Sequence, residues 1–222
     1  MLKMENFFSK NWLVYKISKR HLKLSAKEYA YGKLLDIGCG EKPLQNMFAP
    51  YVTEHIGLDH QDSLHTKDNV DIFGSAYEIP KENEYFDTIL CTAVLEHLEE
   101  PDKAIAEANR VLKKGGIAIY TVPFFWHLHE EPRDFYRYTK YGLKYLFEKN
   151  GFDILELKAL SGFWVTFGQE LVYYLWRFRR GRVRSKIIPL LGGVIQALAY
   201  ILDKADKAES FTWMYLVVAR KK

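Results

Sequence analysis

Leu34-Leu35-Asp36-Ile37-Gly38-Cys39-Gly40 is the stretch that decides the fold of this chain of 222 residues. A short apolar run leads into two glycines that are separated by a single residue. Glycine suits such a turn because a side chain at either position would obstruct a left-handed backbone or the close approach of a ligand. The stretch therefore predicts a strand that ends in a nucleotide-binding turn.

The residues after the turn narrow the type of nucleotide. A dinucleotide fingerprint requires a third glycine, and Pro43 stands in its place, which disfavours a pyrophosphate. A second apolar run, Ile56-Gly57-Leu58, ends on Asp59, about twenty residues after the turn, where α/β nucleotide folds place a carboxylate for the two ribose hydroxyls. The two signals support each other and predict a pocket for a nucleoside.

Short β-rich runs alternate along the chain with segments of helical periodicity. Such alternation predicts a doubly wound α/β fold with a parallel sheet, whose ligands bind at the carboxyl ends of the strands. The expected strands are 34–37, 55–58, 70–73, 88–91 and 117–121, with a helix over 101–112 that Lys113-Lys114-Gly115-Gly116 closes.

The end of the chain departs from this alternation. Residues 141–150 predict a helix stopped by Gly151, residues 152–157 a strand, and residues 212–219 a final β-rich segment before a basic tail. About fifty residues separate these last two strands, far more than a hairpin loop needs. We expect an additional element in this interval.

A third motif, Phe86–Leu98, reads as a strand, a polar turn and the start of a helix. Together with the Gly38-x-Gly40 turn and Asp59 it resembles the class I S-adenosylmethionine-dependent methyltransferases, in particular the small methyltransferase domain of many bacterial enzymes. The resemblance spans about residues 30–160. It implies a Rossmann-like, doubly wound α/β sheet of seven strands, mostly parallel with the last strand antiparallel, and S-adenosylmethionine as the cofactor.

Composition predicts one domain, because 48% of the residues are hydrophobic and no linker-like stretch divides the chain. Amphipathic helices are expected over residues 4–30, packed on the sheet, covering the cofactor, or lying at a membrane surface. The single methyltransferase domain then comprises an N-terminal helical segment (1–31), a cofactor-binding core (32–160), a helical insertion (161–210), and a final strand with a basic tail (211–222).

The resemblance also implies which residues hold the cofactor. Asp36 would anchor the amino end, Asp59 the ribose hydroxyls, and the run Ser75-Ala76-Tyr77 would border the adenine. Family members often carry an aspartate where Ser75 stands, so the adenine contact is weaker here or is made by the backbone. The complete implied set is Asp36, Gly38, Cys39, Gly40, Asp59, Ser75, Ala76, Tyr77, Thr92 and Ala93.

The irregular loop Pro123–Thr139 concentrates titratable and aromatic residues after the fifth expected strand. We expect His129 or Glu130 to accept a proton from the substrate, since removing that proton is the acid–base step of methyl transfer to a hydroxyl or an amine. Two roles remain open for the other polar side chains of the loop. Arg133, Tyr136 and Arg137 orient the substrate, or Glu131, Arg133 and Asp134 form a salt-bridge cluster that holds the loop.

The sequence predicts no metal site. Some RNA-end methyltransferases bind a cation through Glu-x-x-Glu-His, but Ala93 occupies the first glutamate position before Glu96-His97. His127 and His129 alternate sides in an extended backbone, and no cysteine lies nearby, which disfavours zinc. His97 is kept as a third candidate catalytic residue.

The expected insertion begins with an aromatic-rich helix at residues 163–178 and continues into a basic cluster between Arg177 and Lys186 without an acidic residue. The apolar run 187–195 is short and is interrupted by proline and glycines, so we do not expect it to cross a bilayer. The insertion suits a membrane surface or a lipid-linked substrate, and equally a homodimer interface or a cap. Nucleic acid is disfavoured because the net charge is only +4 and no binding module accompanies it.

The loop pattern His-x-His-Glu-Glu-Pro-Arg-Asp-Phe-Tyr-Arg-Tyr-Thr resembles a methyltransferase subgroup associated with bacterial cell-surface polysaccharide biosynthesis. The resemblance implies a hydroxyl on a small molecule or glycan, nucleotide- or lipid-linked, as the acceptor. Methylation of a membrane quinone or lipid, and a non-catalytic module that binds S-adenosylmethionine, remain alternatives.

The cysteines and the first residues bear on localisation. Cys39 and Cys91 both fall in the expected pocket, which does not suit a disulfide framework, and charged residues interrupt residues 1–10, which does not suit a signal peptide. We expect a cytoplasmic protein, with the inner face of the membrane as an open alternative.

Overall fold

A computed structural model describes residues 6–62, 68–206 and 208–222. The backbone divides into two compact units. We call them the sheet unit, which comprises Lys23–Pro123, Leu128–Lys158 and Tyr215–Lys222, and the helical unit, which comprises the residues up to Leu22, Phe124–His127 and Ala159–Met214. The expectation of a single domain with the boundaries given above stays a prediction.

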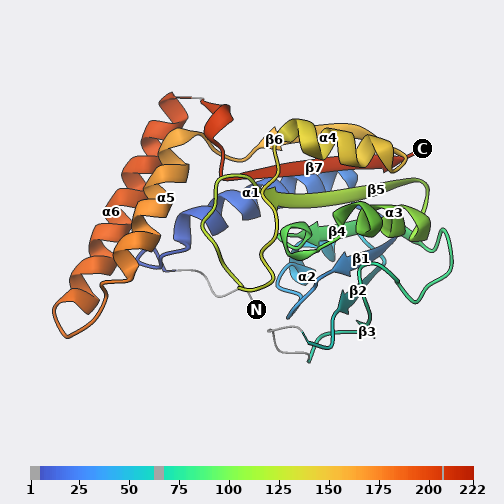
Figure 1. The fold of residues 1–222 in the computed structure, drawn as a ribbon, viewed down its shortest axis with the longest axis horizontal. Helices are drawn as coiled ribbons and strands as arrows, with labels where there is room; N and C mark the ends of the chain where they lie inside the picture. Colours follow the sequence, from blue (N-terminus) through green and yellow to red (C-terminus); the bar gives the residue numbers. More distant parts are fainter. Residues whose placement is uncertain (1–5, 63–67, 207) are drawn as a thin grey trace. The chain divides into compact units, whose positions relative to one another are not determined.

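Seven strands form one sheet in the order β3-β2-β1-β4-β5-β7-β6, as Figure 1 shows. Strands β1, β2, β3, β4 and β5 pair in parallel, as the alternation predicted. The bounds are β1 Lys33–Ile37, β2 Glu54–Asp59, β3 Ile72–Phe73, β4 Phe86–Thr92, β5 Leu112–Pro123, β6 Phe152–Ala159 and β7 Met214–Lys221.

Strand β7 runs antiparallel to both of its neighbours. The amide of Phe124, just after β5, donates to the carbonyl of Trp213, just before β7, over 2.8 Å. The amide of Lys222, after β7, donates to the carbonyl of Gly151, before β6, over 3.1 Å. The end of β5 therefore lies beside the start of β7, and the end of β7 lies beside the start of β6. This confirms the Rossmann-like sheet with one antiparallel strand that the family resemblance implied.

The interior of the sheet is apolar on both faces. Leu34, Leu35, Ile89, Leu90 and Ala118 are fully buried, although neighbouring residues of a strand point to opposite faces. Parallel sheets covered by helices on both sides produce such continuous apolar runs.

The described part of the sheet unit contains α2 (Gln45–Phe48), η1 (Leu95–His97), α3 (Pro101–Val111) and α4 (Lys140–Lys149). The hydroxyl of Thr139 caps α4 by accepting the amide of Gly142 over 3.1 Å, and Gly151 with φ +80° follows its end, as expected. One expectation was wrong: residues 113–116 do not close α3. They belong to β5, because Leu112 already pairs with Phe86 of β4.

Helix α1 (Trp12–Tyr29) is a single helix, where one or two were expected over residues 4–30; residues 4 and 5 lie outside the described residues. Residues 12–22 of α1 belong to the helical unit, which also holds α5 (Phe163–Trp176), α6 (Arg184–Ala205) and η2 (Glu209–Phe211). Figure 1 shows α5 and α6 side by side. The two helices pack closely at Gly168 of α5, which has no side chain. A Cβ at this position would lie only 2.8 Å from the Cβ of Ala199 of α6. The expected helical insertion is therefore a helical hairpin.

Candidate functional site

The turn after β1 has the backbone that its glycines predicted. Gly38 and Gly40 have φ of +69° and +49°, in the left-handed region. A Cβ on Gly38 would lie 2.4 Å from a methyl carbon of Val94, in the turn after β4. The glycine therefore permits both the backbone conformation and the close approach of two loops at the carboxyl ends of neighbouring strands.

The carboxylate of Asp59 joins this turn to the end of β2. It accepts the amide of Gly40 over 2.8 Å through one oxygen and the amide of His60 over 2.7 Å through the other. Each carboxylate oxygen can accept more than one hydrogen bond, so Asp59 keeps capacity for ligand hydroxyls. The residue is 8% exposed and faces the pocket described below.

A buried lysine, Lys42, lies next to the turn after β1 and is held by polar contacts. Lys42 forms an ion pair with Asp71 and donates to the carbonyl of His55 over 3.3 Å. Asp71 also accepts the amide of Gly57 over 2.6 Å. Gly57 has no room for a side chain, since a Cβ would lie 2.3 Å from the Lys42 side chain. Neither Lys42 nor Asp71 was expected at the site, because neither belongs to a recognisable sequence motif.

Asp36 is engaged inside the protein. Its carboxylate lies 3.0 Å from Nε2 of His55 on β2, and both side chains are almost fully buried. Burial raises the pKa of Asp36, and the contact with His55 works in the opposite direction. Asp36 does not line the pocket, so its expected role at the amino end of the cofactor stays a prediction that would run through His55 or water.

A pocket of about 250 Å³ opens at the carboxyl ends of β1 and β2. Six residues that the sequence analysis named line it: Gly38, Asp59, Ser75, Ala76, Tyr77 and His97. Arg133, which the sequence offered as a residue that orients the substrate, also lines the pocket. Eight further residues were not named as site residues: Ile37, Leu58, His60, Gly74, Val94, Leu98, Glu99 and Phe135. Four of the residues expected to hold the cofactor besides Asp36 lie outside this lining: Cys39, Gly40, Thr92 and Ala93.

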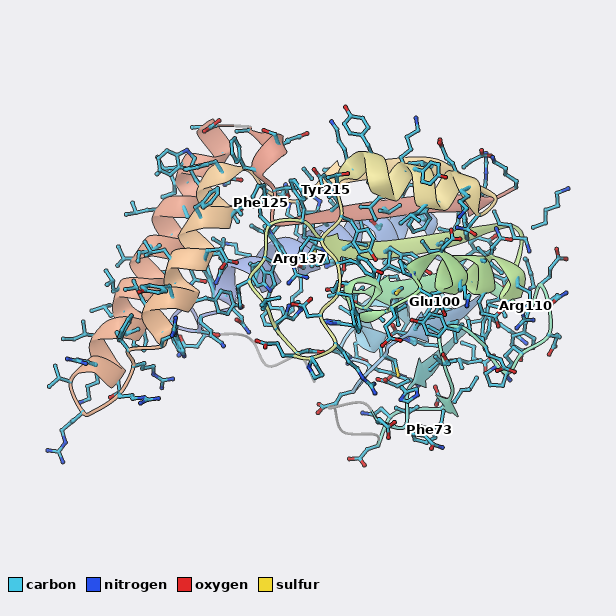
Figure 2. The ribbon with its side chains drawn as sticks, viewed as in Figure 1. Phe73, Glu100, Arg110, Phe125, Arg137 and Tyr215 are labelled. Carbon is cyan, nitrogen blue, oxygen red and sulfur yellow. The ribbon has the colours of Figure 1, made fainter. Side chains whose placement is uncertain are left out.

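The expected adenine border is held by local hydrogen bonds. The Ser75 hydroxyl accepts the amide of Tyr77 over 3.1 Å, and the Tyr77 hydroxyl accepts the amide of Glu100 over 3.2 Å. These bonds fix Tyr77 at the pocket wall between β3 and α3. Glu100 is labelled in Figure 2.

The turn after β4 is strained. Ala93 has φ +52°, and its amide donates to the carbonyl of Thr121 over 2.9 Å. The turn presents Val94 to the pocket in place of Thr92 and Ala93. Cys39 and Cys91 are free and buried, and burial raises the pKa of Cys39 to about 12, so its thiol stays protonated.

The loop after β5 folds back onto η1. The amides of Phe135 and Tyr136 donate to the carbonyl of Glu96 over 2.9 and 3.2 Å. Nδ1 of His97 lies 2.5 Å from the carbonyl oxygen of Arg133, which requires a proton on Nδ1; in the neutral imidazole Nε2 is then an acceptor. Through these contacts the loop places Arg133 and Phe135 at the pocket.

His129 is held by an acidic partner. Its amide donates to Asp134 over 2.9 Å, and its Nδ1 lies 3.3 Å from the same carboxylate oxygen. Burial would raise the pKa of Asp134, but the hydrogen bonds from Arg137, at 2.6 and 2.7 Å, and from the His129 amide lower it. Asp134 therefore stays ionised and can stabilise a protonated imidazole. Figure 2 labels Arg137 in this loop.

The expected salt-bridge cluster therefore exists with a different membership: Arg137, and not Arg133, pairs with Asp134. Arg133 instead faces the pocket. His127, two residues before His129, belongs to the helical unit, where Nδ1 lies 3.1 Å from Glu170.

Glu96 completes a compact polar cluster with His97 and His129. One ligand atom from each of the three lies within 4.8 Å of the others, and Glu130 lies 3.7 Å from Nε2 of His97. Glu96 is fully buried, and neither carboxyl oxygen has a hydrogen-bond partner among the described residues. Burial raises its pKa to about 8, so the carboxyl is largely protonated at pH 7. The cluster can exchange protons, and its donor atoms could also hold a divalent cation.

Part of the sheet unit is similar to known proteins. Residues 35–120 match the family model described as methyltransferase domain. An uncharacterised protein of Methanocaldococcus jannaschii is 28% identical over 61% of this chain and 67% of its own length. The ubiquinone biosynthesis O-methyltransferase of Pelagibacter ubique is 33% identical over 38% of this chain, and a probable S-adenosylmethionine-dependent methyltransferase of Mycolicibacterium smegmatis is 30% identical over 40%. The last two matches take in only 39% and 37% of those relatives' lengths.

Solved structures share the fold at low sequence identity. The [4+2]-cyclase SpnF superposes with a TM-score of 0.59 at 22% identity, covering 92% of this chain and 80% of the cyclase. An S-adenosylmethionine-dependent methyltransferase from Archaeoglobus fulgidus superposes with a TM-score of 0.58 at 18% identity, covering 96% and 95%. Since one neighbour is a cyclase, the fold alone does not decide the reaction, and the site must.

Proposed function

We propose that this chain, which carries an S-adenosylmethionine-dependent methyltransferase domain, transfers the methyl group of that cofactor to a hydroxyl of a glycan or another small molecule. The observation that carries the proposal is the composition of one pocket. Asp59 and Gly38, expected at the nucleoside, line it together with His97 and Arg133, which belong to the polar cluster and its loop. With these roles, nucleoside recognition would meet the polar cluster at His97, while His129 and Glu130 lie outside the lining of this pocket.

S-adenosylmethionine supplies an electrophilic methyl group, so the protein must position the acceptor and remove its proton. Asp59 would accept the ribose hydroxyls, and the Ser75–Tyr77 wall would border the base. Five expected cofactor residues lie outside the pocket lining and would contact the cofactor through the backbone or through neighbours such as His55. They are Asp36, Cys39, Gly40, Thr92 and Ala93.

His129 is the proposed proton acceptor. If Nδ1–H donates to Asp134, which is the nearer of its two Nδ1 partners, then Nε2 carries the lone pair. The ionised Asp134 stabilises the imidazolium that forms when the acceptor hydroxyl loses its proton. Glu130 is the alternative acceptor in the same cluster, and His97 would position the hydroxyl between them.

A sugar hydroxyl on a nucleotide- or lipid-linked intermediate is the acceptor class that the loop pattern supports, and such a role belongs to cell-surface polysaccharide biosynthesis. The Pelagibacter relative supports an alternative by its name, methylation of a membrane quinone or lipid. For either class of acceptor, we infer that the protein acts in the cytoplasm or at the inner face of the membrane.

Two measurements test the proposal. Calorimetry with S-adenosylmethionine should show binding, and a panel of nucleotide sugars, lipid-linked sugars and quinone precursors should be assayed with labelled methyl donor. Methyl transfer to a sugar hydroxyl supports the first acceptor class, and transfer to a quinone supports the alternative. Binding without turnover on any acceptor favours a non-catalytic module, and absence of binding overturns the proposal.

A further inference from the structure

Helix α6 presents most of its large apolar side chains outward. Its buried residues are Ile188, Gly192, Gly193, Gln196 and Ala199. Seven others are between 40% and 63% exposed: Ile187, Leu190, Leu191, Val194, Leu198, Ile201 and Leu202. These seven recur every three or four residues and so share one face. A surface helix of a water-soluble protein has the opposite arrangement.

The inward face cannot turn away from the helical unit. A Cβ on Gly193 would lie 2.8 Å from the ring of Phe7. The side chain of Gln196 accepts the amide of Leu13 over 2.9 Å and donates to the carbonyl of Ser9 over 3.0 Å. Rotating α6 to hide its large residues would break these buried hydrogen bonds and create steric overlap. The apolar face is therefore fixed outward.

Helix α5 adds aromatic side chains with the same periodicity. Trp164, Phe167, Leu171 and Tyr174 are between 39% and 56% exposed. They lie three or four residues apart, on one face of α5. The hairpin of α5 and α6 thus carries two exposed apolar faces, far more than the scattered exposed apolar residues of an ordinary surface.

The connection between the two helices supplies positive charge. Six exposed cations lie there and in the first turn of α6: Arg177, Arg179, Arg180, Arg182, Arg184 and Lys186. No aspartate or glutamate occurs from residue 171 to residue 202. Aromatic and aliphatic side chains beside clustered cations match the boundary between acyl chains and phosphates of a lipid layer.

We propose that the α5–α6 hairpin binds the surface of a bilayer that contains anionic lipids, with its apolar faces at the acyl boundary and residues 177–186 at the phosphates. The charge argues against other occupants. A second copy of this chain would bring the same six cations, and nucleic acid would leave the apolar faces exposed. Among the described residues, α6 is the only helix long and apolar enough to cross a membrane. Its packed inward face and Pro189 favour a position along the surface.

Vesicle sedimentation with the full chain tests this inference. The protein should sediment with vesicles of phosphatidylcholine and phosphatidylglycerol in equal amounts, only weakly with pure phosphatidylcholine, and high salt should release it. Replacing Arg179, Arg182 and Arg184 by glutamine should weaken binding by more than tenfold, since each cation near an anionic surface contributes about fivefold. The matched control replaces Lys23, Lys27 and Lys140, which are also exposed, and should retain binding.

The apolar contribution has its own pair of variants. Leu190→Gln with Leu198→Gln should abolish sedimentation, whereas Leu24→Gln with Leu155→Gln, at similarly exposed positions, should not. Circular dichroism and S-adenosylmethionine binding verify that each variant is folded.

Equal binding by the two apolar variants, or no binding by the unmodified protein, overturns the inference. A dimer in light scattering that Leu190→Gln with Leu198→Gln converts to a monomer, without vesicle binding, assigns the face to a second copy and also overturns it. Because cofactor binding is measured separately, loss of the lipid result leaves the methyltransferase proposal standing.

Discussion

The amide of Gly40 donates to the carboxylate of Asp59 over 2.8 Å, so the turn after β1 and the end of β2 are joined by the same group that is expected to bind the ribose. The pocket is thereby assembled before a ligand enters. A preformed carboxylate loses less conformational freedom on binding than a mobile one would.

Replacing Asp59 by alanine should lower the affinity for S-adenosylmethionine by about tenfold to a hundredfold, because hydrogen bonds to a charged group contribute about 1.5–3 kcal/mol. Calorimetry measures the change. Asp153→Ala, which removes an exposed carboxylate on β6, is the control and should bind normally. Equal affinity of the two variants would remove Asp59 from the cofactor site.

Replacing His129 by alanine should abolish turnover while the affinity for S-adenosylmethionine stays within about threefold, because the imidazole acts on the acceptor. His127→Ala is the matched control, since that imidazole contacts Glu170 in the helical unit. Asp134→Asn should lower kcat and leave KM nearly unchanged if Asp134 stabilises the imidazolium. Normal kcat for His129→Ala would leave Glu130 as the proton acceptor.

Dialysis against a chelator distinguishes proton transfer from metal chemistry in the cluster of Glu96, His97 and His129. If His129 takes the proton directly, turnover should be unchanged by EDTA and by added zinc or magnesium. Activity that disappears with EDTA and returns with one of these ions would assign the three side chains to a cation, and metal analysis of the purified protein would measure its stoichiometry.

Gly38→Ala should destabilise the protein more than Gly115→Ala. Both glycines have positive φ, +69° and +76°, so both variants are strained by about 1 kcal/mol. Only at Gly38 would the new Cβ meet a neighbour, Val94, whereas nothing lies within 4 Å at Gly115. Overpacking adds about 1–3 kcal/mol, visible as a lower Tm. Equal melting temperatures would show that the two loops move apart readily.

Cys39 and Cys91 should react slowly with a thiol reagent in the native protein. Burial raises the pKa of Cys39 to about 12 and that of Cys91 well above its usual range, so little thiolate exists at pH 8. Timed reaction with Ellman's reagent, before and after denaturation in urea, measures the difference. Rapid native reaction of either thiol would show that the turn opens in solution.

Features that depend on residues close together in the sequence were predictable. Gly38-x-Gly40 and Asp59 indicated the nucleoside end, because glycine at positive φ and a carboxylate at a strand end follow from local backbone constraints. The boundary between α3 and β5 was not predictable in the same way, because pairing of Leu112 with Phe86 overrode the local signals for the end of a helix. The roles of Lys42 and Asp71 were not predicted either, since their ion pair joins two segments that carry no sequence motif.

The sequence by itself determined the alternation of strands and helices, the nucleoside turn and the existence of an insertion, since periodicity and turn chemistry are local. Only the tertiary structure decided that Asp36 faces His55, that His129 reaches Glu96 and His97, and which face of α6 is buried. These contacts join residues far apart in the chain. The geometry of these contacts is set by packing in the folded state, and this packing cannot be read from the order of residues.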